Sequence, residues 1–66
     1  MFNNLLAELI KNNMEISKLA EILNISTKVL NMKLLGKKEF ELVECLKIQE
    51  LIGDKNICLE YLFKKS

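Results

Sequence analysis

Polar side chains that could recognise nucleic acid lie three and four residues apart in one short segment of the chain. At helical spacing Lys28 and Asn31 share a face, and Thr27 lies beside them near the helix start. Lysine can donate to guanine O6 or N7, asparagine can pair with adenine through two hydrogen bonds, and Met32 can touch a thymine methyl group. The segment therefore predicts base contacts by Thr27, Lys28, Asn31 and Met32. The alternatives are a solvated helix face and, for Met32, partial packing.

The charge distribution points to the same surface. Residues 22–38 contain four lysines and no acidic residue, whereas the rest of the chain contains six basic and nine acidic residues. One basic segment in a chain of net charge +1 suits a protein that presents one face to a polyanion. Candidate contacts to backbone phosphate are the nearby hydroxyl and ammonium groups of Ser17, Ser26, Lys33, Lys37 and Lys38. For Ser26 a role as helix cap is the alternative, and the two roles are compatible.

The sequence lacks the residue patterns that catalysis and metal binding usually require. The chain has no histidine and no glycine-rich phosphate loop, and its two cysteines, Cys45 and Cys58, give no zinc-ligand pattern. We expect both cysteines to be buried and reduced, with a disulfide as the alternative. Glu39 and Glu41 are interpreted as solvating or helix-start charges. We therefore expect neither an enzyme nor a bound cofactor or metal.

Helices must position these groups, because the chain has no proline, only two glycines, and apolar residues at helical spacing. The pattern predicts an all-α fold of five short helices in a single domain of residues 1–66. The expected helices cover about residues 4–11, 16–23, 27–35, 42–52 and 57–63. Asn3 or Asn4 is expected to cap the first helix, and Gly36 and Gly53 to end the third and fourth.

Each expected helix has an apolar side that should face a common core. In the third helix Leu30 and Leu34 are expected to point inward, and Phe40 should return the following loop to the core. In the fourth helix the expected inward residues are Leu42, Cys45, Leu46, Ile48, Gln49, Leu51 and Ile52.

A turn of three residues separates the second and third expected helices. Two helices that cross steeply through so short a turn need a small residue where they touch, and Ala20 provides it. Asn24 tolerates the left-handed conformation, Ile25 can fill the core beneath the turn, and Ser26 can cap the next helix. With the inward Leu30, these residues meet the geometric needs of two crossed helices.

This run resembles the helix-turn-helix of the Cro/repressor-type regulators, the XRE family. The family pattern of Leu-Ala, three residues, Gly or Asn, an apolar residue and Ser is matched by Leu19-Ala20 and Asn24-Ile25-Ser26. Gly36-Lys37 is similar to the Gly-basic pair that follows the family's recognition helix, and the likeness covers about residues 5–63. The resemblance implies a lambda-repressor-like fold with its helix-turn-helix over about residues 16–35. It also implies a sequence-specific transcription regulator, a phage- or prophage-type repressor, whose third helix enters the major groove.

Three positions depart from the family pattern toward apolar side chains. Ile16 stands where the family often has a phosphate-contacting Gln, Leu35 where it often has Asn, and Met32 at a groove-facing site that is usually polar. These departures favour an alternative function, a protein-interaction module on the same fold, antirepressor- or antitoxin-like, with weak or lost DNA binding. The lysine segment without acidic residues favours double-stranded DNA as the partner.

The small size of the chain favours pairing with a second copy. A 66-residue domain buries only about 60% of the surface that its unfolded chain exposes. We expect a homodimer on a two-fold operator, with an interface of Leu59, Tyr61, Leu62 and Phe63. Closure of the monomer core by Tyr61 and Leu62 is the alternative. Because the sequence shows no membrane span, signal peptide or effector domain, we expect a cytoplasmic protein without a small-molecule effector.

Overall fold

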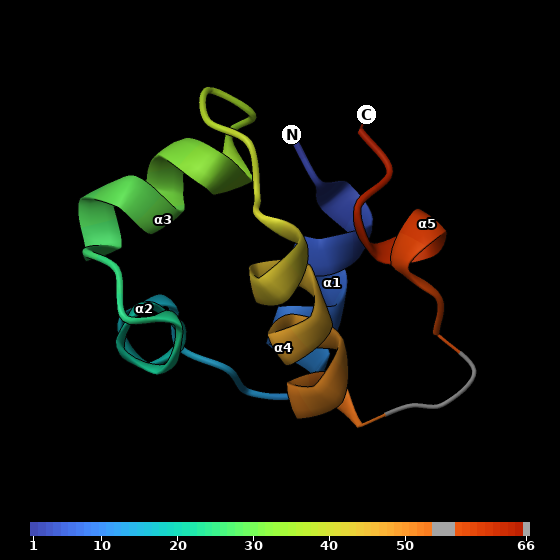
Figure 1. Cartoon of the computed structure of the whole chain (residues 1–66). Helices are drawn as coiled ribbons and strands as arrows, with labels where there is room; N and C mark the ends of the chain where they lie inside the picture. Colours follow the sequence, from blue (N-terminus) through green and yellow to red (C-terminus); the bar gives the residue numbers. More distant parts are fainter. Residues whose placement is uncertain (54–56, 66) are drawn as a thin grey trace.

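The computed structural model describes residues 1–53 and 57–65, and within them the chain is all-helical and contains no strand (Figure 1). The helices are α1 (Asn3–Lys11), α2 (Ile16–Leu23), α3 (Thr27–Leu34), α4 (Leu42–Ile52) and α5 (Leu59–Leu62). The bounds expected for α2 and α4 are confirmed, while α1 begins one residue earlier and α3 ends one residue earlier than expected. The last helix, α5, is limited to four residues. None of the helices in the described ranges is long and apolar enough to cross a bilayer.

One side chain from each helix meets at the centre of the molecule. These five fully buried side chains are Leu5, Leu19, Leu30, Ile48 and Leu62. Burying an aliphatic side chain of this size stabilises the fold by about 1.5–3 kcal/mol relative to leaving it exposed. Each helix is therefore anchored to the shared core by one of these side chains.

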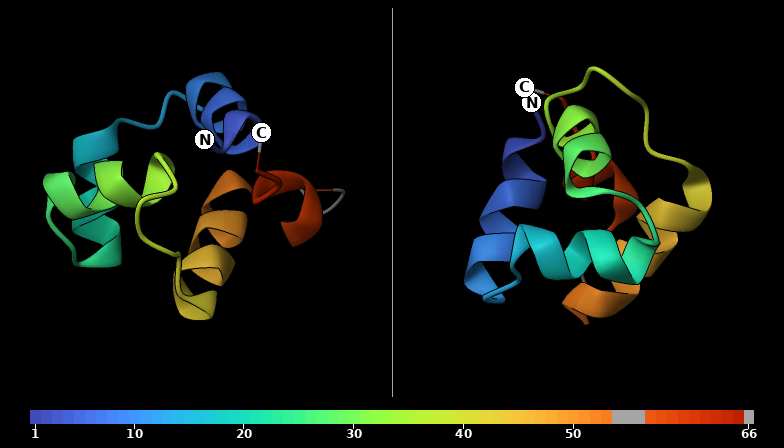
Figure 2. Two further views of the ribbon diagram at one scale, coloured as in Figure 1. Left: turned by 90° about the horizontal axis from the view of Figure 1, so that it is seen from above. Right: turned by 90° about the vertical axis from the view of Figure 1, so that its left-hand side faces the viewer.

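The helices form two neighbouring groups. Helix α2 packs on α3, and α5 packs on both α1 and α4. In Figure 1 α2 is seen down its axis while α3 runs across the view, so the two cross steeply. Figure 2 shows both chain ends at the same edge of the molecule, where α1 and α5 are in contact. The α2–α3 pair lies beside this edge, since Met1 lines a pocket together with Ile16 of α2 and Leu34 of α3.

The turn between α2 and α3 has the conformation that its sequence predicts. Asn24 adopts the left-handed region, with φ 58° and ψ 42°, and ends α2. The Ile25 N–H donates to the Ala20 carbonyl at 3.0 Å, and the Ile25 side chain packs against the core. The Ser26 Oγ then accepts a hydrogen bond from the Val29 N–H at 3.1 Å and caps α3. These contacts fix the path of the chain from one helix into the next.

The start of α1 differs from the expectation. Phe2 occupies the cap position, without a side-chain hydrogen bond, and neither Asn3 nor Asn4 caps the helix. Phe2 is drawn there because its ring is buried, only 5% exposed, among other aromatic rings. The Asn4 side-chain amide instead donates to the Tyr61 carbonyl at 2.9 Å and ties α1 to α5.

Helix α4 is rotated relative to the expected orientation. Its buried residues are Glu44, Ile48 and Ile52, which lie four residues apart, while Leu42 and Leu46 are 67% and 47% exposed. Leu51 is also exposed, so the expected inward position of these three leucines is wrong. The physical reason is that Glu44 has a buried partner, which turns its side of the helix toward the core.

The left-handed turn at Asn24 can be tested by substitution. Asn24→Ala should lower the free energy of unfolding by about 1 kcal/mol, because a Cβ-bearing residue without a local hydrogen-bonding group is strained in this region. Asn24→Gly should leave that free energy nearly unchanged or raise it, since glycine enters the region without a steric cost. Urea denaturation followed by circular dichroism measures both. Equal losses in the two variants would contradict the assignment.

Candidate nucleic-acid interface

Helix α3 presents two chemically different faces. Leu30 and Leu34 are buried, as expected, and seal this helix onto the core. Thr27, Lys28 and Asn31 are exposed on the other side. This exposed set is called the polar face of α3 below. Thr27 and Lys28 lie in the first turn of α3, and Asn31 lies in the next.

Met32 lies at the margin of the polar face and is half-buried. Its burial agrees with the alternative of partial packing. The remaining exposed part of the side chain can still contribute an apolar contact next to Lys28, which lies four residues earlier on the same helix.

Four of the five candidate phosphate contacts are exposed. Ser17 lies in the first turn of α2, Ser26 caps α3, and Lys37 and Lys38 follow α3 in the next loop. Because the Ser26 Oγ accepts from Val29, its hydroxyl proton is free to be donated elsewhere, so the capping role leaves the second role open.

The loop that carries Lys37 and Lys38 is held by its backbone. Both residues donate their N–H groups to the Met32 carbonyl, at 2.9 and 3.3 Å. The preceding Gly36 has φ 85°, which turns the chain sharply after α3. The two ammonium groups are therefore attached to a loop folded back on the last turn of α3.

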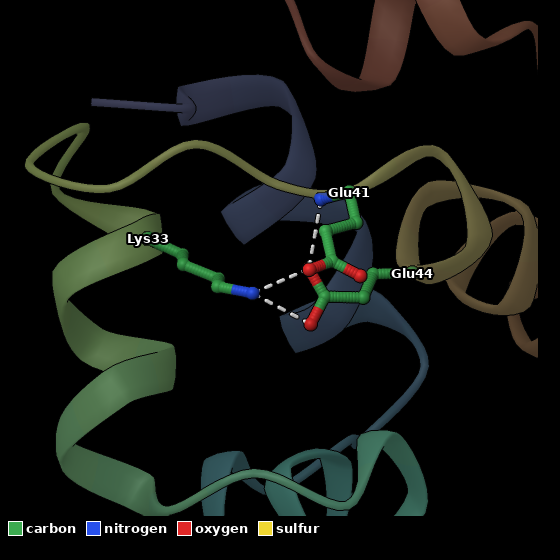
Figure 3. A network of polar contacts seen from close by, with 3 residues as sticks. All are labelled: Lys33, Glu41 and Glu44. Carbon is green, nitrogen blue, oxygen red and sulfur yellow. Dashed lines mark hydrogen bonds and ion pairs between the residues drawn. The ribbon is translucent and has the colours of Figure 1, made fainter.

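Lys33 differs from the other candidate lysines, Lys37 and Lys38, because it is not exposed. It is buried, at 7% exposed, and its Nζ lies 2.6 Å from both carboxylate oxygens of Glu44 (Figure 3). The same carboxylate accepts the backbone N–H of Glu41 at 2.9 Å through Oε1. An ammonium group engaged in this way is not available to a phosphate, so Lys33 leaves the set of candidate contacts.

Glu44 is ionised in this environment. Burial by itself raises the pKa of its carboxyl, and the hydrogen bonds from Lys33 and the Glu41 backbone act in the opposite direction. With the added charges of Lys33 and Lys47, they lower the pKa below the usual 4.5. The Lys33–Glu44 pair is therefore a true ion pair at neutral pH, and it joins α3 to the beginning of α4.

The sequence contains a signal for Glu44 that hydropathy alone does not reveal. Glu44, Ile48 and Ile52 form a row with a spacing of four, and Lys33 directly precedes the buried Leu34. Lys33 thus lies next to the buried side of α3, and Glu44 lies on the buried side of α4. These two positions could have been recognised as a buried ion pair. Burial of an ion pair is uncommon, because desolvation of both charges has a large cost.

An apolar pocket of about 390 Å³ lies beside the polar face of α3. It is lined by Ile16 at the start of α2 and by Leu34 and Leu35 at the end of α3, together with Met1, Leu6 and Asn31. Two of the three residues that depart from the XRE pattern, Ile16 and Leu35, thus belong to one pocket. Asn31 belongs both to this pocket and to the polar face.

The residues expected to form a dimer interface are only partly accessible. Leu62 is fully buried in the core, and Phe63 is half-buried and stacks edge-to-face with Phe2. Leu62 therefore has no surface left for a second copy and cannot belong to an interface, while the assignment of Phe63 stays a prediction for its accessible part. Leu59 is half-buried and Tyr61 is 43% exposed. The alternative expectation was that Tyr61 and Leu62 close the monomer core. It holds for Leu62 and fails for Tyr61.

The cysteines do not both lie in the core. Cys45 is half-buried and Cys58 is exposed, each as a free thiol, so the burial expected for Cys58 is wrong. Among the described residues, no three histidine, cysteine, aspartate or glutamate side chains lie where they could hold a metal ion.

Comparison with known proteins adds no relative. No protein-family model, no curated protein and no solved structure matches this chain.

The ion pair generates a double-variant prediction. Lys33→Met alone should lower the free energy of unfolding by about 3 kcal/mol, because it leaves the Glu44 carboxylate buried without its counter-charge. Lys33→Met combined with Glu44→Leu should recover most of that loss, since apolar side chains of similar volume can replace a buried pair. A double variant as unstable as the single one in chemical denaturation would contradict this account.

The same pair makes the stability depend on pH. Because the pKa of Glu44 is lower in the folded chain, its contribution is fully present above its usual pKa of 4.5. That contribution is lost as the pH falls through the lowered, folded-state pKa. Between pH 5 and about pH 3, the native chain should therefore lose more unfolding free energy than the Lys33→Met/Glu44→Leu variant. Parallel pH profiles for the two proteins would rule out an ionised pair.

Proposed function

We propose that this chain is a sequence-specific, DNA-binding transcription regulator, most simply a phage-type repressor. In this proposal α2 and α3 form a helix-turn-helix of the Cro/repressor type, and α3 enters the major groove. The observation that carries the proposal is the polar face of α3, where Thr27, Lys28 and Asn31 are exposed on a helix whose opposite face is sealed onto the core.

The packing of α3 supports this role. An α-helix fits the major groove, which is about 12 Å wide, provided that its outer side is free of other protein. Helix α3 is anchored by Leu30, Leu34 and the Lys33–Glu44 pair, all on one side. A rigidly held helix can present Lys28 and Asn31 to base edges with little loss of conformational freedom on binding.

Phosphate contacts would fix the register of α3 without reading the sequence. Ser17 and Ser26 lie at the beginnings of α2 and α3, where the helix dipole and free N–H groups favour an anion. Lys37 and Lys38 lie at the other end of α3. The candidates therefore flank the polar face at both ends, as backbone contacts on either side of a reading helix would.

Selection of duplexes from a random pool tests the proposal directly. The native chain should enrich a defined sequence, and Lys28→Ala/Asn31→Ala should weaken binding to that sequence by about tenfold to a hundredfold for each lost base contact. The loss should be much smaller on unrelated DNA. Failure to retain any duplex at low ionic strength would overturn the proposal.

The salt dependence of binding provides a second, quantitative prediction. If Lys37 and Lys38 each neutralise one phosphate, the slope of log K against log salt should be about −1.8 per chain. Lys37→Ala/Lys38→Ala should bring the slope closer to zero by about 1.8. The matched control is Lys33→Met/Glu44→Leu, which keeps the net charge and should leave the slope unchanged. A slope altered by that control would place Lys33 on the DNA.

A two-fold operator bound by two copies remains part of the proposal. With Leu62 inside the monomer, the contact between copies would use Tyr61 and the accessible parts of Leu59 and Phe63. Tyr61→Glu should then shift the mass measured by sedimentation equilibrium toward that of one chain. A native protein that is already monomeric at high micromolar concentration would remove the dimer from the proposal.

The apolar pocket favours a second candidate function, capture of a protein partner with weak or lost DNA binding. Ile16 and Leu35 line this pocket beside Asn31, so a partner side chain seated there would cover part of the polar face. Ile16→Gln and Leu35→Asn discriminate the two functions. They restore the side chains found in the XRE pattern and should preserve or strengthen DNA binding, whereas they should abolish capture of a partner.

A further inference from the structure

Three phenylalanine rings from distant parts of the chain form a cluster at the edge where the chain ends meet. Phe2 precedes α1, Phe40 lies in the loop before α4, and Phe63 follows α5. The ring centroids are 5.5 Å apart for Phe2–Phe40, 5.9 Å for Phe2–Phe63 and 5.1 Å for Phe40–Phe63, all in edge-to-face arrangements. Aromatic rings prefer this edge-to-face packing. In it, both the edges and the faces of the rings are available to line a pocket.

A pocket of about 200 Å³ opens over this cluster. The three phenylalanines form its apolar wall together with Cys45 of α4. An apolar cavity of about 150 Å³ is enough to hold a benzene molecule, so the pocket accepts one six-membered ring but not a large ligand.

Charged side chains of both signs line the same pocket. Lys38 and Lys65 contribute two ammonium groups, and Glu39 contributes one carboxylate. All three residues are exposed, so the charges stand at the rim above the apolar wall. The excess of one positive charge favours an anionic group at the mouth of the pocket and an apolar body inside it.

Cys45 acts in this pocket as part of the wall. Burial, with the neighbouring negative charge of Glu44, raises the pKa of its thiol above the usual value. The thiol is therefore protonated at neutral pH, when it is a weak hydrogen-bond donor and a poor nucleophile. A ligand held here would be bound without forming a covalent bond.

We propose that this pocket binds a small aromatic monocarboxylate, with its ring against the three phenylalanines and its carboxylate between Lys38 and Lys65. A neutral aromatic molecule would leave both ammonium groups unused, and a bare anion would leave the apolar wall exposed to water. The site is separate from the polar face of α3. Under the proposed function Lys38 also meets a DNA phosphate, so ligand and DNA would compete for one ammonium group.

Benzoate and benzamide test the proposal, because they share a ring and differ in charge. Each is titrated into the isotope-labelled native chain without DNA, at low salt, and backbone amide shifts are followed by NMR. Benzoate should bind with a dissociation constant of about millimolar, as expected for so few atoms, and shift the amides of Phe40, Cys45 and Phe63. Benzamide should bind about four- to twenty-five-fold more weakly, because it loses the contribution of both ammonium groups. Acetate should cause no comparable shifts.

Exposed lysines provide variants that do not endanger folding. Lys38→Ala and Lys65→Ala should each weaken benzoate binding about two- to fivefold, and the combination should make benzoate and benzamide equal. Lys37→Ala and Lys64→Ala are the neighbouring controls, which remove the same charge outside the pocket and should change little. The proposal is overturned by equal affinity for benzoate and benzamide in the native chain. It is also overturned by equal losses in the controls, or by the absence of shifts at millimolar ligand. Because the measurement contains no DNA, these outcomes do not depend on the proposed function.

Discussion

The ion pair between Lys33 and Glu44 connects the two helices that determine what this molecule presents to solvent. With both charged groups buried, α3 cannot slide or rotate against α4 without leaving a charge unpaired, and that costs far more than a shifted apolar contact. The pair thereby fixes the rotation of α3, which puts Lys28 and Asn31 outside. It also fixes the rotation of α4, which puts Leu42 and Leu46 outside. One interaction thus sets both a polar and an apolar surface.

Local rules in the sequence were sufficient for the segment around the turn. Asn24, Ile25 and Ser26 adopt the predicted roles because a left-handed residue, a core plug and a cap depend on neighbours within a few positions. The bounds of α2 and α4 were predictable for the same reason. The polar face of α3 also followed from helical periodicity, since Leu30 and Leu34 point inward and Lys28 and Asn31 outward.

Long-range partners explain what the sequence did not reveal. The orientation of α4 and the burial of Lys33 depend on the contact between Lys33 and Glu44, which are 11 positions apart. Because of this contact, Glu44 and not the leucines lies on the inner side of α4. Phe63 and Leu62 were expected at an interface because their partners, such as Phe2, lie at the opposite end of the chain. The pocket beside Phe40 could not be foreseen, because it exists only where three distant segments converge.

The bond from the Asn4 amide to the Tyr61 carbonyl spans 57 positions of sequence, whereas the α2–α3 pair is held by residues close to one another. Closing so long a loop has a considerable entropic cost, whereas the turn at Asn24 closes only a few residues. The contact between α1 and α5 should accordingly be the last to form during folding and the first to break in local unfolding. The free energy of the local opening that lets amide hydrogens exchange with solvent would then be lower around Leu62 than in α3. Fraying at the chain ends would leave the crossed helices intact.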